Sequence, residues 1–236
     1  ADPVKYAEAI AAGNTFVTND AAFRRAHGDD GFSHIVVTSA DAEKDHRAFL
    51  ERGVSGGDLV SFSRRFERPD GSLDTLAVNL AFATHPAATS GHFFTCENVV
   101  APELDHSALL EHENGVLGAR RVISTASVPS TYADFYSQLF GSTNVIAGDQ
   151  SVDCAAPNGL VSIVTPDLLA QEYGVGLRSA AADLRHRGLV FAVRVLSSAE
   201  ALFARNRVPF ERHNGRLIIQ PRSEGGFFFG FEQDPE

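Results

Sequence analysis

Short runs of apolar positions along the chain show strand spacing and helical spacing in turn. Residues 32–39 (FSHIVVTS) form an apolar, β-branched run that predicts a strand. Residues 41–53 place apolar residues among charges at helical spacing, with Asp41 as a plausible N-cap and Gly53 as the stop. The first pattern is therefore a strand followed by a helix.

Three further strands are expected after this helix. Residues 59–67 and 73–82 alternate between apolar and polar positions, and the intervening RPDGS supplies turn chemistry. Residues 91–98 (GHFFTCEN) read as a fourth strand with an apolar centre. The order of this unit is βαβββ.

The same order returns twice. The second copy comprises a strand at 119–126, a helix at 131–141 that ends at Gly141, and strands at 143–149, 151–157 and 159–166, followed by a short helix at 167–174. The third comprises a strand at 188–196, a helix at 198–207 capped by Ser197 or Ser198, and strands within 209–215, 216–221 and 225–232, with Asn214 and Gly215 as a tight hairpin turn. The chain is predicted to be α+β.

The predicted domain organisation follows from the expectation that βαβββ units pack in pairs. Each small sheet has an apolar face that it cannot bury alone, so such units should pair, and three units leave one without a partner. We therefore expect a further N-terminal unit to be incomplete here, in line with the absence of methionine, even at position 1. The predicted domains are a remnant or connection at 1–31, a unit at 32–98, a linker or lid at 99–118, a unit with its extra helix at 119–187, and a unit at 188–236.

Composition narrows the function classes. The 236 residues are 44% hydrophobic and 21% charged, and the net charge of −10 argues against a nucleic-acid partner. No apolar run is long enough to cross a bilayer, and the N-terminus lacks signal-peptide character, so we expect a cytoplasmic protein. Cys96 and Cys154 form no CxxC pair and are expected to be reduced thiols. Binding or conversion of a small molecule is therefore the function class that remains.

Two stretches resemble a known family. FSHIVV at 32–37 is similar to the first-strand signature of the vicinal oxygen chelate superfamily, which includes glyoxalases, extradiol dioxygenases and bleomycin-resistance proteins. GHFFTCEN at 91–98, followed by APEL and HENGVLG, resembles a bacterial glyoxalase-like branch. The resemblance implies tandem βαβββ modules that pair into half-open barrels, each able to hold a divalent metal with open positions for substrate oxygens.

Carried over by position, the resemblance implies that His34 on the first strand and Glu97 on the fourth are metal ligands, with Glu97 also acting as a catalytic proton shuttle. A histidine and a carboxylate suit Zn, Ni, Mn or Fe(II). The other units depart from this pattern. The second has Arg121 where a histidine is expected, and the third has Glu232 in its fourth strand but no histidine in its first.

Each candidate also has a structural interpretation. His34 can be a polar strand-start residue, and Glu97 a solvated strand end or an ion-pair partner. Arg64 and Arg65 can clamp an anionic substrate or serve solubility, and at most one of them faces inward because neighbouring strand residues point to opposite faces. Phe94 is a candidate substrate-binding residue. The cluster of His106, Glu111, His112 and Glu113 lacks HExxH spacing and belongs to a loop or lid.

Two functions stay open at this point. One is a metal-dependent lyase, isomerase or dioxygenase that acts on a small oxygenated metabolite. The alternative is a metal-free protein that binds an apolar or anionic small molecule, as drug-sequestering members of the superfamily do. The expected partners are a small-molecule substrate or ligand and, in a homodimer, a second copy of the chain.

Overall fold

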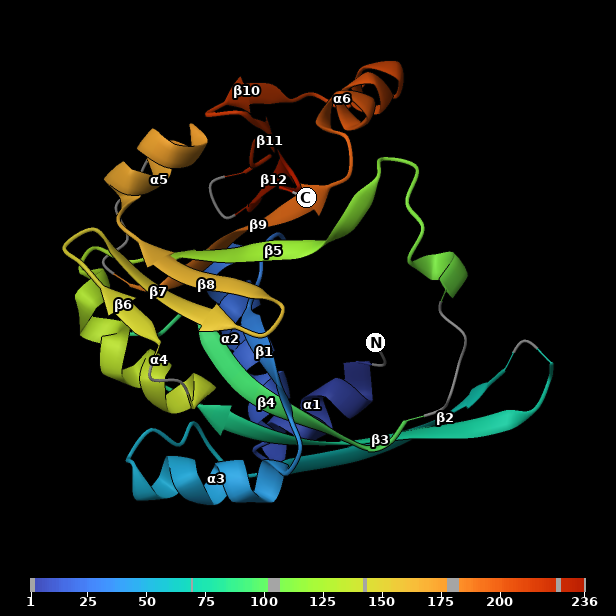
Figure 1. Ribbon diagram of the computed structural model, residues 1–236. Coiled ribbons are helices and arrows are strands. Elements are labelled where there is room, and N and C mark those ends of the chain that lie inside the picture. Colours follow the sequence, from blue (N-terminus) through green and yellow to red (C-terminus); the bar gives the residue numbers. More distant parts are fainter. Residues whose placement is uncertain are drawn as a thin grey trace. The chain divides into compact units, whose positions relative to one another are not determined.

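The computed structural model describes residues 3–68, 70–101, 107–141, 144–177, 183–223 and 226–235. The chain divides into two compact units. Unit 1 comprises residues 1–26 and 33–104, and unit 2 comprises residues 27–32 and 105–236. Figure 1 shows the elements of both units, which are taken in turn below. No helix among the described residues is long and apolar enough to span a membrane.

Unit 1 contains a four-stranded sheet with a helix on each side. Its elements are α1 (Pro3–Ala11), α2 (Thr15–His27, whose last residue belongs to unit 2), β1 (His34–Ser39), α3 (Ala42–Glu51), β2 (Val60–Glu67), β3 (Leu73–Ala83) and β4 (His92–Val100). The strand order is β1-β4-β3-β2, with β1 parallel to β4 and the other pairs antiparallel. Helices α2 and α3 lie on opposite sides of β3 and β4 (Figure 1).

The described residues of unit 2 form an eight-stranded sheet and three α-helices. Its elements are the 3₁₀ turn η1 (Ser107–Leu109), β5 (Val116–Thr125), the 3₁₀ turn η2 (Pro129–Tyr132), α4 (Ala133–Phe140), β6 (Val145–Ala147), β7 (Ser151–Ala156), β8 (Gly159–Val164), α5 (Pro166–Tyr173), β9 (Arg185–Val193), α6 (Leu196–Arg205), β10 (Glu211–His213), β11 (Arg216–Ile219) and β12 (Phe228–Gln233). The strand order is β10-β11-β12-β9-β5-β8-β7-β6.

This order shows two copies of the four-stranded arrangement of unit 1, joined edge to edge. Each half orders its strands first-fourth-third-second, with the first strand parallel to the fourth. The first strands β5 and β9 lie side by side and antiparallel, which joins the halves into one sheet. The predicted α+β fold of tandem βαβββ modules is confirmed.

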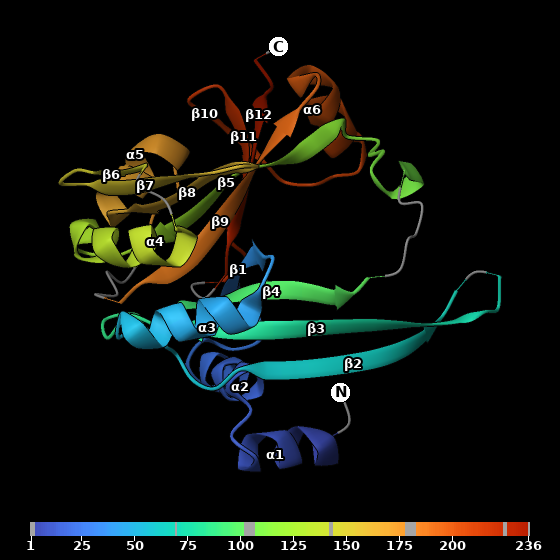
Figure 2. The same ribbon diagram turned by 60° about the horizontal axis from the view of Figure 1, so that its bottom comes forward.

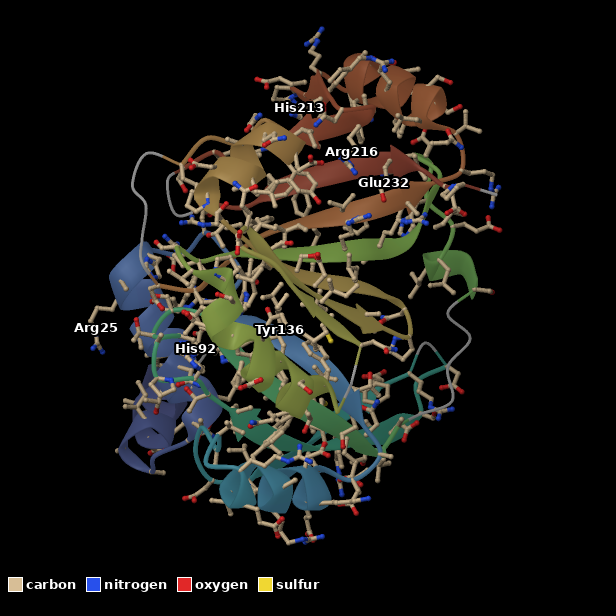
Figure 3. The ribbon with its side chains drawn as sticks, turned by 60° about the vertical axis from the view of Figure 1, so that its left-hand side comes forward. Arg25, His92, Tyr136, His213, Arg216 and Glu232 are labelled. Carbon is tan, nitrogen blue, oxygen red and sulfur yellow. The ribbon has the colours of Figure 1, made fainter. Side chains whose placement is uncertain are left out.

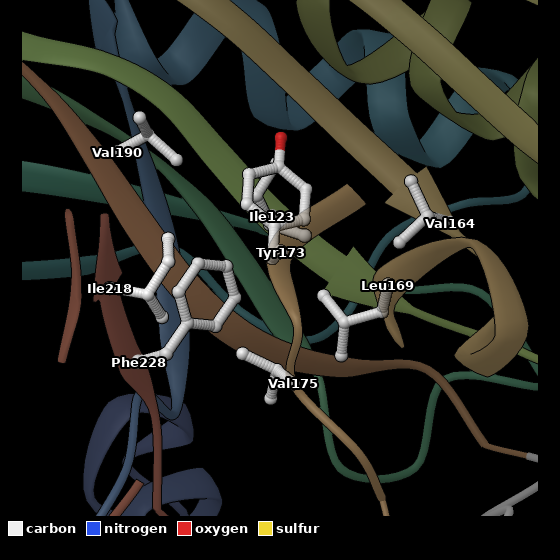
Figure 4. Close-up of a cluster of buried hydrophobic side chains, with 8 residues drawn as sticks. All are labelled: Ile123, Val164, Leu169, Tyr173, Val175, Val190, Ile218 and Phe228. Atoms are coloured by element: carbon white, nitrogen blue, oxygen red, sulfur yellow. The ribbon is translucent and has the colours of Figure 1, made fainter. Parts of the chain in front are cut away.

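The eight-stranded sheet has a different helix layer on each face, as Figure 2 shows for α4 and α5. Leu169 and Tyr173 of α5 pack against Ile123 and Phe228 in a buried cluster (Figure 4). Phe203 of α6 packs on the other face with residues such as Phe231. We call the first surface the α5 face; its strand residues include Ile123, Val190 and Phe228. Burial of these two clusters holds the sheet between the two helix layers.

Local signals in the sequence placed several element ends well. Asp41 accepts a hydrogen bond from the Lys44 amide at 2.8 Å and caps α3, as predicted. Gly141 ends α4 in the left-handed region, at φ 59°, where glycine is favoured. Asn214 and Gly215, at φ 45° and 77°, form the predicted hairpin turn.

The predicted cap of the last helix was wrong. Helix α6 begins at Leu196, so Ser197 and Ser198 lie inside its first turn, and Val195 is the N-cap residue without a side-chain cap. The amide of Leu196 instead donates to Oε1 of Gln233 at 2.8 Å, 37 residues away on β12. Because this partner comes from a distant strand, no local capping pattern could reveal it. The proposed origin of residues 1–31 and the lid role of 99–118 stay predictions.

Candidate functional site

Glu97 on β4 caps the helix of its own module. Its Oε2 accepts hydrogen bonds from the backbone amide of Ala42, the first residue of α3, at 3.1 Å and from Asn79 Nδ2 at 3.2 Å. A carboxylate at a helix N-terminus satisfies an amide that has no partner within the helix and complements the helix dipole. The geometry therefore gives Glu97 a structural role that neither sequence interpretation had considered.

His34 lies on the other face of the same sheet. His34 pairs in register with His92 and Ser39 with Glu97, and successive strand residues alternate between faces. The His34 ring contacts the rings of Phe16, His92 and Phe94, with centroid distances of 5.3, 5.2 and 5.5 Å. Its Nδ1 lies 2.8 Å from Ser33 Oγ. The structure thus does not bring His34 and Glu97 to one point, as a shared metal ion would require.

The remaining sequence candidates of unit 1 are not gathered either. Arg64 and Arg65 are exposed neighbours on β2 and face opposite sides of the sheet. Phe94 is 6% exposed and packs in a core cluster with Leu80 and Phe82. Their roles in substrate binding stay predictions.

The remaining sequence candidates are Cys96 on β4 and the cluster within residues 106–113. Burial raises the pKa of the Cys96 thiol, which favours its protonated form. His106 lies outside the described residues, and Glu113 forms an exposed ion pair with Arg205.

Comparison of the modules shows which fourth-strand position faces away from the module helix. Gln233 caps α6 as Glu97 caps α3, so these two residues are equivalent. Glu232, one position earlier, must point to the opposite side of the sheet, the α5 face. In unit 1 the residue at that position is Cys96. In the last module, the fourth-strand carboxylate on the α5 face is therefore Glu232.

Three guanidinium groups surround Glu232. Its carboxylate oxygens lie 2.8 Å from Arg216 Nε, 3.3 Å from Arg120 Nε and 3.9 Å from Arg121 Nε. Figure 3 shows Arg216 of β11 and Glu232 of β12 side by side. Arg120 also donates to Asp234 at 2.7 Å. Three cations against two carboxylates leave one positive charge in a chain whose net charge is −10.

An irregularity in β5 lets two adjacent arginines share this site. The pairing of β5 with β9 shifts register between Ala119 and Arg121, and such a bulge re-aims a side chain relative to regular alternation. The backbone at the bulge presses against Gly159, where a Cβ would lie 2.7 Å from the Arg120 carbonyl oxygen. Only glycine leaves room for this approach. We name Arg120, Arg121, Arg216 and Glu232 the arginine cluster.

Tyr173 of α5 borders the arginine cluster. The guanidinium carbon of Arg216 lies 5.2 Å from the centre of its ring, a cation–π contact. Burial raises the pKa of the Tyr173 phenol, while nearby Arg121 and Arg216 oppose the shift. The end of α5 is held by the hairpin that carries Arg216, since His213 Nε2 and Asn214 Nδ2 both lie within hydrogen-bonding distance of the Gln171 carbonyl oxygen. This contact positions α5 beside the cluster.

Two clefts open at the arginine cluster, and both are lined by Arg120 and Arg121. One, of about 460 Å³, is also lined by Arg216 and Glu232. The other, of about 430 Å³, extends along β5 and β8 past Leu160 and Asp234. The Arg121 Nε atom is buried, and among the described residues no acceptor lies within hydrogen-bonding distance of it. The Arg121 side chain as a whole is 35% exposed and lines both clefts, so its guanidinium group can pair with a bound anion.

The sequence alone did not indicate that Arg121 and Glu232 lie close together. Arg121 occupies the position where the second unit lacks the expected histidine, and Glu232 is the fourth-strand carboxylate of a third unit whose first strand has no histidine. The structure places them 3.9 Å apart because β5 and β12 both flank β9. Two adjacent arginines at the first-strand signature position were the available signal.

The donor set does not suit the divalent metal that the superfamily implies. A cation beside Glu232 would face three guanidinium groups, which oppose it electrostatically. His34 and His92 share a face, and the His34 ring contacts the rings of His92, Phe16 and Phe94. Within the described ranges no group of three or more His, Cys, Asp or Glu side chains could hold a metal ion.

Comparisons with known proteins place the chain in a family. A model of the glyoxalase-like domain matches residues 2–140, more than half of the chain. A hypothetical protein from Staphylococcus aureus is similar over 98% of this chain and 76% of its own, with 12% identity and a TM-score of 0.57. A triple mutant of 4-hydroxymandelate synthase from Streptomyces coelicolor is similar over 93% and 74%, with 15% identity and a TM-score of 0.51.

No curated protein sequence matches the chain. The two structural likenesses show the shared fold alone. The family match and the three βαβββ modules agree with each other. The chain belongs to the glyoxalase-like domain family of the vicinal oxygen chelate superfamily.

Proposed function

We propose that the α5 face of unit 2 binds a small organic carboxylate at the arginine cluster, without a metal ion. The observation that carries this proposal is the grouping of three guanidinium groups around one carboxylate beside two clefts. Arginine presents a planar fork that matches a carboxylate, and a local excess of positive charge selects an anion from solution. This is the metal-free alternative that the sequence left open.

Glu232 acts as an internal competitor in this proposal. It already forms ion pairs with Arg120 and Arg216, so an incoming carboxylate must share the guanidinium groups with it or replace it. Arg121 is the arginine farthest from Glu232, at 3.9 Å, and it lines both clefts. Arg121 is therefore the expected anchor for the ligand.

Substitution of Glu232 separates this proposal from a metal site. For the full chain, first passed over a chelating resin, acetate binding is measured by calorimetry in a buffer free of carboxylates. Glu232→Gln removes the negative charge that pairs with Arg120 and Arg216 and is expected to raise acetate affinity at least several-fold. If Glu232 were a metal ligand for substrate binding, the same variant would abolish binding, and added Zn²⁺ would strengthen binding by the unsubstituted protein.

Arginine variants complete the experiment. Arg121→Gln is expected to weaken acetate binding about tenfold or more, because it removes a charged hydrogen-bond donor. Arg212→Gln is the matched control, since Arg212 also pairs with a glutamate, Glu200, but lies on β10 outside both clefts. Equal losses in the two variants, or no acetate binding by the unsubstituted chain, would overturn the proposal. The metal-dependent enzyme and the homodimer stay predictions.

A further inference from the structure

The cleft of about 430 Å³ is lined by apolar residues as well as by two residues of the arginine cluster. Apart from the two arginines, Asp234 and Asn158, its side chains are apolar: Leu117, Ala119, Leu160 and Ala192. Its two glycines, Gly118 and Gly159, add backbone but no side chain. The cleft therefore places apolar side chains next to charged ones.

The strand register explains this arrangement. Arg121 on β5 pairs with Leu160 on the neighbouring strand β8, so the two side chains share a face of the sheet. Ala192 lies on β9, on the other side of β5. A ligand held at Arg121 would thus have its remaining atoms beside Leu160 and Ala192. Gly159 lets the backbone of β8 approach Arg120 closely at this point.

We infer that the ligand of this cleft is an amphiphilic organic acid, with a carboxylate at Arg121 and a short apolar tail along Leu117 and Leu160. This inference rests on the proposed carboxylate site and adds the chemical class of the rest of the ligand. A volume of about 430 Å³ fits a small-molecule ligand. Inorganic anions would leave the apolar wall in contact with water.

A series of straight-chain acids tests the tail. Acetate, butyrate, hexanoate and octanoate are titrated into the full chain, and affinity is plotted against carbon number. Burial of methylene groups predicts a rise of about two- to fourfold per methylene until the cleft is filled. Leu117→Asn is expected to flatten this rise. Leu117 is 49% exposed, so its replacement leaves the buried core in place. Leu160→Asn provides a second variant, on the neighbouring strand β8.

Val195→Asn is the control, because Val195 is 45% exposed and lies outside the cleft. A rise with chain length that survives in Val195→Asn and flattens in Leu117→Asn supports the inference. Equal affinity for acetate and hexanoate would overturn the inference and leave the carboxylate site standing. Tighter binding of phosphate than of any acid of the series would have the same consequence. Failure of every acid to bind would overturn both.

Discussion

The carboxylate of Glu97 accepts a hydrogen bond from the Ala42 amide, 3.1 Å away, and so joins the end of a fourth strand to the start of its own module's helix. Gln233 and Leu196 repeat the relationship in the last module. A fourth-strand side chain therefore caps the helix in two of the three modules. The residue before it, Cys96 or Glu232, faces the opposite side of the sheet.

Removal of the Glu97 cap should destabilise the protein. Glu97→Ala is expected to lower the free energy of unfolding by about 1–2 kcal/mol, because an amide of α3 loses its acceptor. Glu97→Gln keeps an acceptor oxygen and should cost less. Urea unfolding at neutral pH measures both, with Glu67→Ala on the exposed strand β2 as the control. A cost for Glu97→Ala no greater than that of Glu67→Ala would contradict the capping role.

Gly159 should tolerate no side chain. A Cβ there would lie 2.7 Å from the Arg120 carbonyl oxygen, so Gly159→Ala must displace the backbone of the β5 bulge. We expect a loss of about 1–3 kcal/mol in unfolding free energy and weaker acetate binding, since Arg120 and Arg121 move with the bulge. Gly176→Ala is the matched control, because nothing lies within 4 Å of its Cβ. Similar stabilities of the two variants would argue against this packing.

Gly188 and Phe228 should be energetically coupled. The Phe228 ring covers Gly188, where a Cβ would lie 2.3 Å from the ring. Gly188→Ala is expected to cost about 1–3 kcal/mol by overpacking, and Phe228→Ala about 3–5 kcal/mol by leaving a cavity. The double variant should cost less than the two single losses together, because its alanine no longer meets the ring. Strict additivity in chemical denaturation would refute this contact.

Stability should fall at alkaline pH through Tyr136. The residue is fully buried on α4, and this burial raises the pKa of its phenol. The folded state therefore favours the neutral phenol, and its stabilisation is complete below the unfolded pKa of about 10. As pH rises further, unfolding releases a proton, and the free energy of unfolding decreases by up to about 1.4 kcal/mol per pH unit from this group.

Tyr136→Phe removes this titration. Unfolding free energies of the variant and the unsubstituted protein are compared between about pH 8 and pH 11, where the phenol ionises in the unfolded chain. The difference between them should be constant at the lower end and shift in favour of the variant above about pH 10. Curves that stay parallel over the whole range would show that Tyr136 does not contribute.

Local patterns predicted the modules because their signals lie within a few residues. Asp41 reaches the Lys44 amide, Gly141 ends α4, and Asn214 with Gly215 turns the last hairpin. The helix cap from Gln233 was missed because 37 residues separate it from Leu196. The same limit affected Glu97, whose partner amide is 55 positions away.

Within the three modules, the sequence by itself determined the order of strands and helices, because hydrophobic periodicity and turn residues act over short distances. It did not predict the helices α1 and α2 within residues 1–31. Only the tertiary structure decided which face each polar strand residue occupies, since a shift of one position reverses the face. It also brought Arg121 of the second module to Glu232 of the third, because β5 and β12 both lie next to β9. The candidate site thus depends on strand neighbours that the chain order does not reveal.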